Sequence, residues 1–234
     1  MIDSYTSETL EEGLIIPFDK PYGWTSFDLV NLVRKKFCQF TGLKKLKVGH
    51  AGTLDPLATG LLILCTGRAT KLIESIQAMV KEYEAEIILG ATTPSFDRET
   101  DIDHTYPIQH INYSLIEEKV QLFKGKIKQI PPVYSAKKIE GTRAYEFARS
   151  GIAKKMGPID IEIYDTKIIY YRMPVLKLKI ICSRGTYIRS LARDLGFELN
   201  SGGYLSGLRR TAIGDYNIKE AMIIEKFQNK LNFL

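Results

Sequence analysis

Long apolar runs, paired cysteines and a secretion signal are missing from this sequence of 234 residues. The apolar run at residues 61–65 is far shorter than the roughly 20 residues of a membrane-spanning helix. Residues 1–12 are polar and acidic, whereas a secretory signal needs a basic start and an apolar stretch. The three cysteines, Cys38, Cys65 and Cys182, are odd in number and far apart, which argues against a disulfide framework. We therefore expect buried thiols, no membrane segment and a cytoplasmic protein.

Several familiar catalytic signatures are also absent. The sequence contains no G-x-x-x-x-G-K-[ST] loop for phosphates, no G-x-G-x-x-G after a strand and no G-x-S-x-G around a serine nucleophile. Its histidines, His50, His104 and His110, lack paired cysteines and helical i, i+4 partners. The sequence therefore argues against nucleotide, dinucleotide, serine-hydrolase and zinc sites.

The positive charge is unevenly distributed. The net charge is +6, and the hydrophobic content of 44% is ordinary for a chain that buries a core. Basic residues gather in three groups: Arg34, Lys35, Lys36, Lys44, Lys45 and Lys47; Lys124, Lys126, Lys128, Lys137, Lys138 and Arg143; and Lys177, Lys179, Arg184, Arg189 and Arg193. One such group alone is typical of a solvated face, but the three together also fit a nucleic-acid partner.

The hydrophobic pattern predicts the fold class. Apolar runs and alternation predict strands at residues 14–16, 61–64, 82–89, 161–171 and 175–182. Capping residues and helical spacing predict helices after Thr25 or Ser26, at 116–123 with Gly125 just past the end, at 143–149 and after Thr186. Residues 95–103 read as an acidic loop. Strands follow one another without regular intervening helices, which indicates an α+β fold with a largely antiparallel sheet.

One carboxylate stands out in the stretch "GHAGTLDPLATG", residues 49–60. Pro56 biases Asp55 toward an extended backbone, so this carboxylate does not lie inside a helix. Taken alone, Asp55 fits an Asp-Pro turn whose side chain bonds to its own backbone. A carboxylate can also act as a nucleophile toward an anomeric carbon or an activated ring.

Five stretches resemble the motifs of one enzyme family. "KVGHAGTLDPLATGLLILCTGRATK" is similar to the catalytic motif of the tRNA pseudouridine-55 synthases, the TruB-type enzymes, and "FDKPYGWTSFDLV" resembles their N-terminal motif. "FKGKIKQIPPVYSAKKIEGTRAYEFARSG", "CSRGTYIRSLARDLG" and "LSGLRRTAIGDY" resemble the remaining motifs. They follow the family order from Leu14 to Tyr216. Ala51 stands where many members have threonine, and Thr53 stands where many have alanine.

This resemblance implies an isomerase that acts on a T-loop uridine of tRNA. The base is detached from the sugar, turned and reattached through carbon, with Asp55 as the essential group and without a metal or cofactor. Asp55 attacks the sugar, attacks the uracil ring or assists an elimination, and the sequence leaves these routes open. The family fold is a mixed, mostly antiparallel sheet flanked by helices, with an RNA-binding cleft.

The resemblance also assigns partners to Asp55. Arg189 is implied as its cationic neighbour, against the alternative of a surface arginine, and Asp97 as an acid that pairs with Arg189. Tyr83 is implied to stack on the extruded uracil and to take a ring proton, against the alternative of a core aromatic.

Further residues are implied to bind the substrate around the target base. Leu208 packs on the other side of the base, and His50 occupies the space that the flipped base leaves; a core leucine and a structural histidine are the alternatives. Gly49 and Lys71, both within the catalytic motif, complete the expected set of substrate contacts.

For the whole chain we expect a single catalytic domain, residues 1–234, that acts as a monomer. Residues 1–12 are expected to be flexible, and residues 211–234 to form a short helix instead of a complete C-terminal RNA-binding domain. A non-catalytic RNA-binding module or tRNA folding chaperone is the main alternative, and Asp55 argues against it because a carboxylate repels phosphate. A related synthase that works inside a guide-RNA particle is the other alternative.

Overall fold

The computed structural model describes residues 5–134, 138–139, 142–143 and 156–232. It divides into two compact units, each treated separately below. Unit 1 comprises Met1–Glu82 and Arg209–Leu234, and unit 2 comprises Tyr83–Leu208. The β4 and β12 strands contribute residues to both units.

The centre of unit 1 is a buried strand covered on both faces. Its strands are β1 (Ile15–Lys20), β2 (Val48–His50), β3 (Ala58–Thr66), β13 (Tyr216–Asn217) and the end of β12 (Gly203–Ile213). The β3 strand pairs antiparallel with β1 along one edge and with β2 along the other, and β12 also lies on the edge away from β1. Leu62 and Leu64 face one apolar cluster, whereas Leu61 and Ile63 face a second. This alternation follows from the period of two along a strand.

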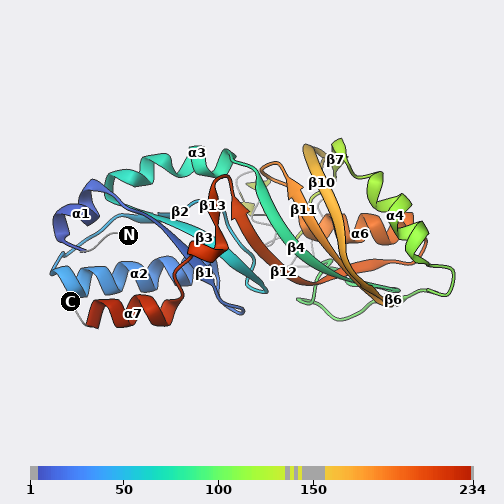
Figure 1. Cartoon of the computed structure of the whole chain (residues 1–234), viewed down its shortest axis with the longest axis horizontal. Coiled ribbons are helices and arrows are strands. Elements are labelled where there is room, and N and C mark those ends of the chain that lie inside the picture. Colours follow the sequence, from blue (N-terminus) through green and yellow to red (C-terminus); the bar gives the residue numbers. More distant parts are fainter. Residues whose placement is uncertain (1–4, 135–137, 140–141, 144–155, 233–234) are drawn as a thin grey trace. The chain divides into compact units, whose positions relative to one another are not determined.

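Helices close both clusters of unit 1. They are α1 (Ser7–Glu12), α2 (Ser26–Thr41), the 3₁₀ helix η1 (Gly67–Leu72), α3 (Ile73–Ala78), the 3₁₀ helix η2 (Ile218–Glu220) and α7 (Ile224–Asn232). Figure 1 shows α2 and α7, from opposite ends of the chain, side by side. Phe227 of α7 packs edge-on against Phe18 and Phe37, which fixes the C-terminal helix to the core.

Unit 2 is a sheet with helices and two small hairpins. Within the sheet, neighbours run in the order β12, β4 (Lys81–Leu89), β11 (Val175–Cys182), β10 (Ile159–Arg172) and β7 (Gly125–Gln129). The β10 strand pairs antiparallel with β11 and β7. The helices among its described residues are α4 (Tyr113–Gln121) and α6 (Ile188–Glu198). The hairpins are β5 (Ala91–Thr92) with β6 (His104–Thr105), and β8 (Lys138–Ile139) with β9 (Thr142–Arg143).

Most of the predicted elements are confirmed. The α+β class holds, and the predicted strands match β1, β3, β4, β10 and β11. Thr25 caps α2 through a capping box with Asp28. Cys65 and Cys182 are buried and Cys38 is half-buried, all as free thiols. Among the described residues, no helix is long and apolar enough to span a membrane. The helix predicted at 143–149 falls almost wholly on residues outside the described part of the chain.

Four details differ from the expectations. The N-terminal stretch contains a helix, α1, which buries Leu10 in the core of unit 1. The α4 helix ends at Gln121, four residues before Gly125, which begins β7. Thr186 does not cap α6, since its hydroxyl donates to the carbonyl of Ser183. Residues 211–234 are not one helix: β12 runs to Ile213, and α7 begins only at residue 224.

Candidate active site

The Asp55 carboxylate belongs to a loop of unit 1 between β2 and β3. Asp55 is half-buried, and its own carbonyl accepts the N–H of Ala58 at 3.0 Å. Before it, the N–H of Ala51 donates to Ile63 at 2.8 Å. After it, the carbonyl of Pro56 accepts the N–H of Gly23 at 2.9 Å. The loop is therefore fixed to neighbouring elements on both sides of the carboxylate.

Ser26, in the first turn of α2, holds the residue directly before Asp55. Its hydroxyl accepts the N–H of Leu54 at 2.9 Å and donates to the carbonyl of the same residue at 3.1 Å. Ser26 is 3% exposed, so both bonds form away from water. One buried hydroxyl thus satisfies both backbone groups beside the carboxylate.

Lys20, at the end of β1, is a buried cation beside the same loop. Its Nζ donates to the carbonyls of Trp24, Pro21 and Pro56 at 2.6, 3.0 and 3.4 Å. Burial lowers its pKa to about 8, against an opposing effect of the Asp55 charge. That attraction is mutual, so Lys20 also favours the ionised carboxylate. Sequence reasoning missed Lys20, although the period of two along β1 places it on the same buried face as Phe18.

Arg210 is a second buried cation that reasoning from the sequence did not single out. It is 1% exposed, and its Nε and Nη2 donate to the carbonyls of Leu61 at 2.8 Å and Gly52 at 2.9 Å. It therefore ties β12 to the glycine three residues before Asp55. The preceding Arg209 points to the other face of the strand and pairs with Asp19 at 2.6 Å. The sequence did carry a signal for a buried arginine here. Successive residues of a strand point to opposite faces, so of two successive arginines only one can face outward.

The other residues predicted in unit 1 have mixed surroundings. His50 ends β2, and burial together with the nearby Arg210 charge lowers its pKa, so its imidazole is neutral at pH 7. Its Nδ1 is buried without a hydrogen-bond partner among the described residues. Gly49 packs against Ile73, whose Cδ1 would lie 2.7 Å from an added Cβ, a contact that a shift of the isoleucine side chain would relieve. Lys71 is exposed on η1.

In unit 2, Arg189 and Asp97 form the pair that the resemblance implies. Their Nη1 and Oδ2 atoms lie 3.4 Å apart, and the side chains are 5% and 7% exposed. Arg189 also donates to the carbonyl of Tyr134 at 2.8 Å, and Asp97 accepts the N–H of Glu99 at 2.9 Å. Arg189 is therefore not a surface arginine, and Asp97 is not a solvated carboxylate.

Tyr83 and Leu208 are the first and last residues of unit 2 in the sequence. Tyr83 is 9% exposed and shares the buried face of β4 with Ala85 and Ile87. Leu208 is half-buried on β12. The predicted residues thus divide between the units: Gly49, His50, Asp55 and Lys71 belong to unit 1, and Tyr83, Asp97, Arg189 and Leu208 to unit 2.

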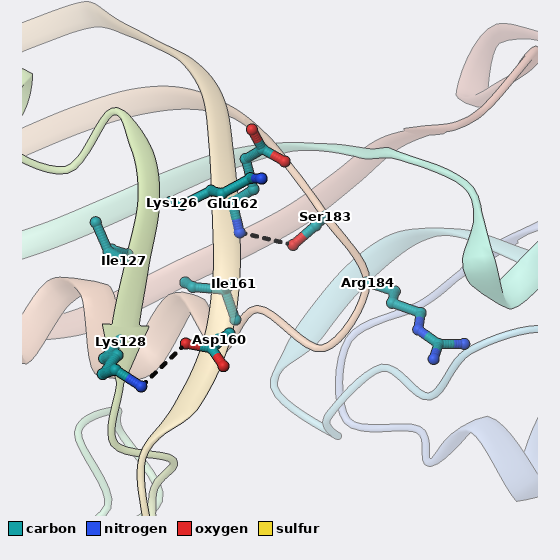
Figure 2. Close-up of a pocket in the computed structure, with 8 residues that line it drawn as sticks. All are labelled: Lys126, Ile127, Lys128, Asp160, Ile161, Glu162, Ser183 and Arg184. Atoms are coloured by element: carbon teal, nitrogen blue, oxygen red, sulfur yellow. Dashed lines mark hydrogen bonds and ion pairs between the residues drawn. The ribbon is translucent and has the colours of Figure 1, made fainter.

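Unit 2 also carries an open pocket of about 480 Å³ between the edge of its sheet and the end of β11. Figure 2 shows its lining of Lys126, Ile127, Lys128, Asp160, Ile161, Glu162, Ser183 and Arg184. Lys126 lies opposite Glu162 across β7 and β10, and Lys128 pairs with Asp160 at 3.3 Å. No group of His, Cys, Asp and Glu side chains in the described residues is arranged to hold a metal ion.

Comparisons of the sequence with known proteins find named relatives that cover nearly the whole chain. The chain is 51% identical to the tRNA pseudouridine synthase B of Phocaeicola vulgatus over 222 residues, which cover 95% of this chain and 94% of the relative. It is 48% identical to the protein of the same name from Flavobacterium johnsoniae over 227 residues, covering 97% and 99%.

Solved structures show the same fold at lower identity. An H/ACA RNP bound to a substrate RNA containing 2′-deoxyuridine matches with a TM-score of 0.68 at 23% identity, over 94% of this chain and 53% of that one. A Cbf5-Nop10-Gar1 complex matches with a TM-score of 0.70 at 24% identity, over 94% and 54%. The chain therefore spans about half the length of these two solved chains.

A family model of the N-terminal domain of TruB family pseudouridylate synthases matches residues 38–188. This range includes the Asp55 loop and ends at the first residue of α6, one residue before Arg189. Together with the relatives that are 51% and 48% identical in sequence, this match shows that the chain belongs to the TruB family of pseudouridylate synthases.

Proposed function

We propose that this protein is a tRNA pseudouridine synthase that isomerises the T-loop uridine at position 55 of tRNA. The observation that carries the proposal is the Asp55 carboxylate, held on a loop that Ser26, Lys20 and Arg210 fix through backbone groups. A fixed, half-buried carboxylate beside buried cations is suited to covalent or electrostatic work on a sugar or base.

The reaction breaks the bond between C1′ of the ribose and N1 of uracil and forms a bond between C1′ and C5. The proton on C5 leaves, and N1 gains one, so atoms balance without an oxidant or reductant. Asp55 acts on the sugar, acts on the ring or assists an elimination. In this proposal no metal or cofactor takes part.

The remaining predicted residues act on the extruded base. Base extrusion requires a pocket that stacks on the flipped ring. We assign stacking and a late proton transfer to Tyr83, the opposite side of the base to Leu208, and the vacated space in the RNA to His50. Its neutral imidazole suits a position among stacked bases.

Arg189 is the cationic partner that we assign to Asp55, with Asp97 orienting its guanidinium through the buried ion pair. The proposal treats residues 1–234 as a single catalytic domain. We also assign substrate contacts to Gly49 and Lys71.

The proposed setting is a monomer in the cytoplasm that binds the T-arm of tRNA. Only the basic groups favour the alternative of a non-catalytic RNA chaperone. That alternative does not explain why three separate side chains fix the backbone around one carboxylate.

Incubation of the purified protein with an unmodified tRNA transcript tests the proposal. Sequencing that maps pseudouridine should find one new modification, at the T-loop uridine. An unmodified T-loop, with RNA binding intact, would favour the chaperone and overturn the proposed activity.

A further inference from the structure

The three basic groups of the sequence differ in their surroundings. Five of the cations in unit 2 contact a carboxylate: Lys124 with Asp165 at 2.8 Å, Lys128 with Asp160 at 3.3 Å, Lys177 with Glu86 at 2.9 Å, Arg189 with Asp97 at 3.4 Å and Arg193 with Asp194 at 2.6 Å. Each pair offsets positive charge locally, so these residues attract a polyanion less than their number suggests.

The group in unit 1 is different, and we call it the 34–47 basic surface: Arg34, Lys35, Lys36, Lys44, Lys45 and Lys47. The sequence from residue 29 to residue 54 contains no acidic residue. Within the part of the chain that the structure describes, none of these six cations has a carboxylate at ion-pair distance. Lys35, Lys44, Lys45 and Lys47 are exposed.

The packing of the segment before β2 keeps Lys47 in solvent. Leu46 and Val48, on either side of it, are 3% and 7% exposed and belong to the core of unit 1. The carbonyl of Lys47 accepts the N–H of Gly67 at 2.9 Å, and Arg34 donates to the carbonyl of Val48 at 3.3 Å. The backbone is therefore fixed while the ammonium group stays hydrated.

The chain limits how far this surface can lie from the carboxylate. Lys47 precedes Asp55 by eight residues. An extended chain spans at most about 3.6 Å per residue, so the two Cα atoms lie within about 29 Å of each other. A phosphate held at Lys47 is therefore only a few nucleotides, or a few base pairs of stem, from a base held at Asp55.

We infer that the 34–47 basic surface binds the RNA phosphates that flank the target uridine and supplies most of the salt-dependent affinity for the T-arm. The inference rests on the proposed function for the identity of the RNA. Phosphate contacts of this kind fix the register of a nucleic acid without reading its sequence. The pocket of Figure 2, where Lys126 and Arg184 form no ion pair within the described residues, is the rival phosphate site.

Salt titrations of binding test the inference. The RNA is a T-arm hairpin with cytidine in place of the target uridine, so that no turnover occurs. Each phosphate contact contributes about 0.7–0.9 to the slope of log K against log salt. We expect the triple substitution Lys44→Gln, Lys45→Gln, Lys47→Gln to make the slope shallower by about two and to weaken binding at low salt by about tenfold or more.

The paired lysines provide the matched control, because Lys124→Gln with Lys128→Gln removes similar exposed charges. This double variant should change the slope by less than about 0.5. An unchanged slope in the triple variant, or a larger change with Lys126→Gln and Arg184→Gln, would overturn the inference and place the phosphates elsewhere. Wild-type pseudouridine formation on a transcript is measured separately. If it fails while the triple variant loses affinity, the proposed function is wrong and the phosphate surface stands.

Discussion

Single residues around Asp55 act on the backbone of its loop. Lys20 has no exposed surface, and its Nζ reaches the carbonyl of Pro56 directly after the carboxylate. Arg210 reaches the carbonyl of Gly52 on the other side. Buried cations that donate to these carbonyl oxygens keep their charge near the carboxylate and restrict the movement of its loop.

The pH dependence of stability tests the environment of Lys20. Its pKa in the folded chain is about 8, against the ordinary 10.5. The folded state therefore binds this proton more weakly than the unfolded state, and the cost of the buried charge disappears as the pH rises from 8 to 10.5. Relative to Lys20→Met, the free energy of unfolding of the wild-type chain should rise by up to about 3 kcal/mol over this window. Urea unfolding at pH 7 and pH 10 measures the difference; a constant difference would contradict this account of Lys20.

The buried pair of Arg189 and Asp97 makes a second prediction for single residues. Asp97→Ala removes a carboxylate from a buried guanidinium and should lower the free energy of unfolding by about 3 kcal/mol. Asp97→Asn should cost less, because the amide oxygen can still accept the N–H of Glu99. Denaturant melts of both variants give the comparison. If the alanine variant is as stable as the wild type, the pair does not hold Arg189 in place.

At the scale of elements, the start of α2 combines two neighbouring hydroxyls with different partners. Thr25 caps the helix, whereas Ser26 bonds both backbone groups of Leu54. Ser26→Ala should lower kcat by about tenfold, equal to about 1.4 kcal/mol, with KM nearly unchanged, because the loop of Asp55 loses its anchor. Activity and thermal melting are measured on the same preparations.

Thr25→Ala is the matched control for that prediction. Loss of the cap should cost about 1 kcal/mol of stability and leave kcat close to the wild-type value. Equal effects of the two substitutions on kcat would mean that Ser26 acts only through the stability of α2.

Local patterns predicted those elements whose sequence signal is local. The alternation along β4 and β11 and the capping box of α2 are complete within a few residues of sequence. The start of α6 is different: the side chain of Gln129 accepts the N–H of Tyr187 at 2.8 Å and donates to its carbonyl at 3.1 Å. No pattern near Thr186 carries that information, because the partner is 58 residues away.

The C-terminal segment shows the same limit of local reasoning. Met222 exchanges backbone hydrogen bonds with Pro17 and Asp19 at 2.9 and 3.0 Å, so residues 221–223 extend along β1 although their sequence fits a helix.

The candidate site could also be predicted only in part from the sequence. Asp55 was found from its motif, and Asp97 and Arg189 from the resemblance, whereas the roles of Lys20 and Arg210 depend on which face of a strand the fold buries.

For the whole molecule, recognition should depend on contacts near the target base. Base flipping needs contacts on both sides of the extruded nucleotide, and the 34–47 basic surface is tied to the Asp55 loop by a short stretch of chain. An isolated T-arm hairpin should therefore be modified nearly as well as full tRNA, within about tenfold in kcat/KM or about 1.4 kcal/mol. Rates on the two RNAs are compared side by side. A loss of about a thousandfold on the hairpin would show that distant tRNA contacts are required.

The central claim is that the Asp55 carboxylate performs the chemistry, and Asp55→Asn tests it most directly because it removes the charge and keeps the shape. Single-turnover pseudouridine formation on an unmodified tRNA transcript is measured together with tRNA binding, with Asp215→Asn, an exposed carboxylate of unit 1, as the control. The account predicts wild-type behaviour for the control. For Asp55→Asn it predicts intact binding and a rate lower by at least about a thousandfold, or about 4 kcal/mol of transition-state stabilisation. Turnover of the asparagine variant above a few per cent of the wild-type rate would contradict it.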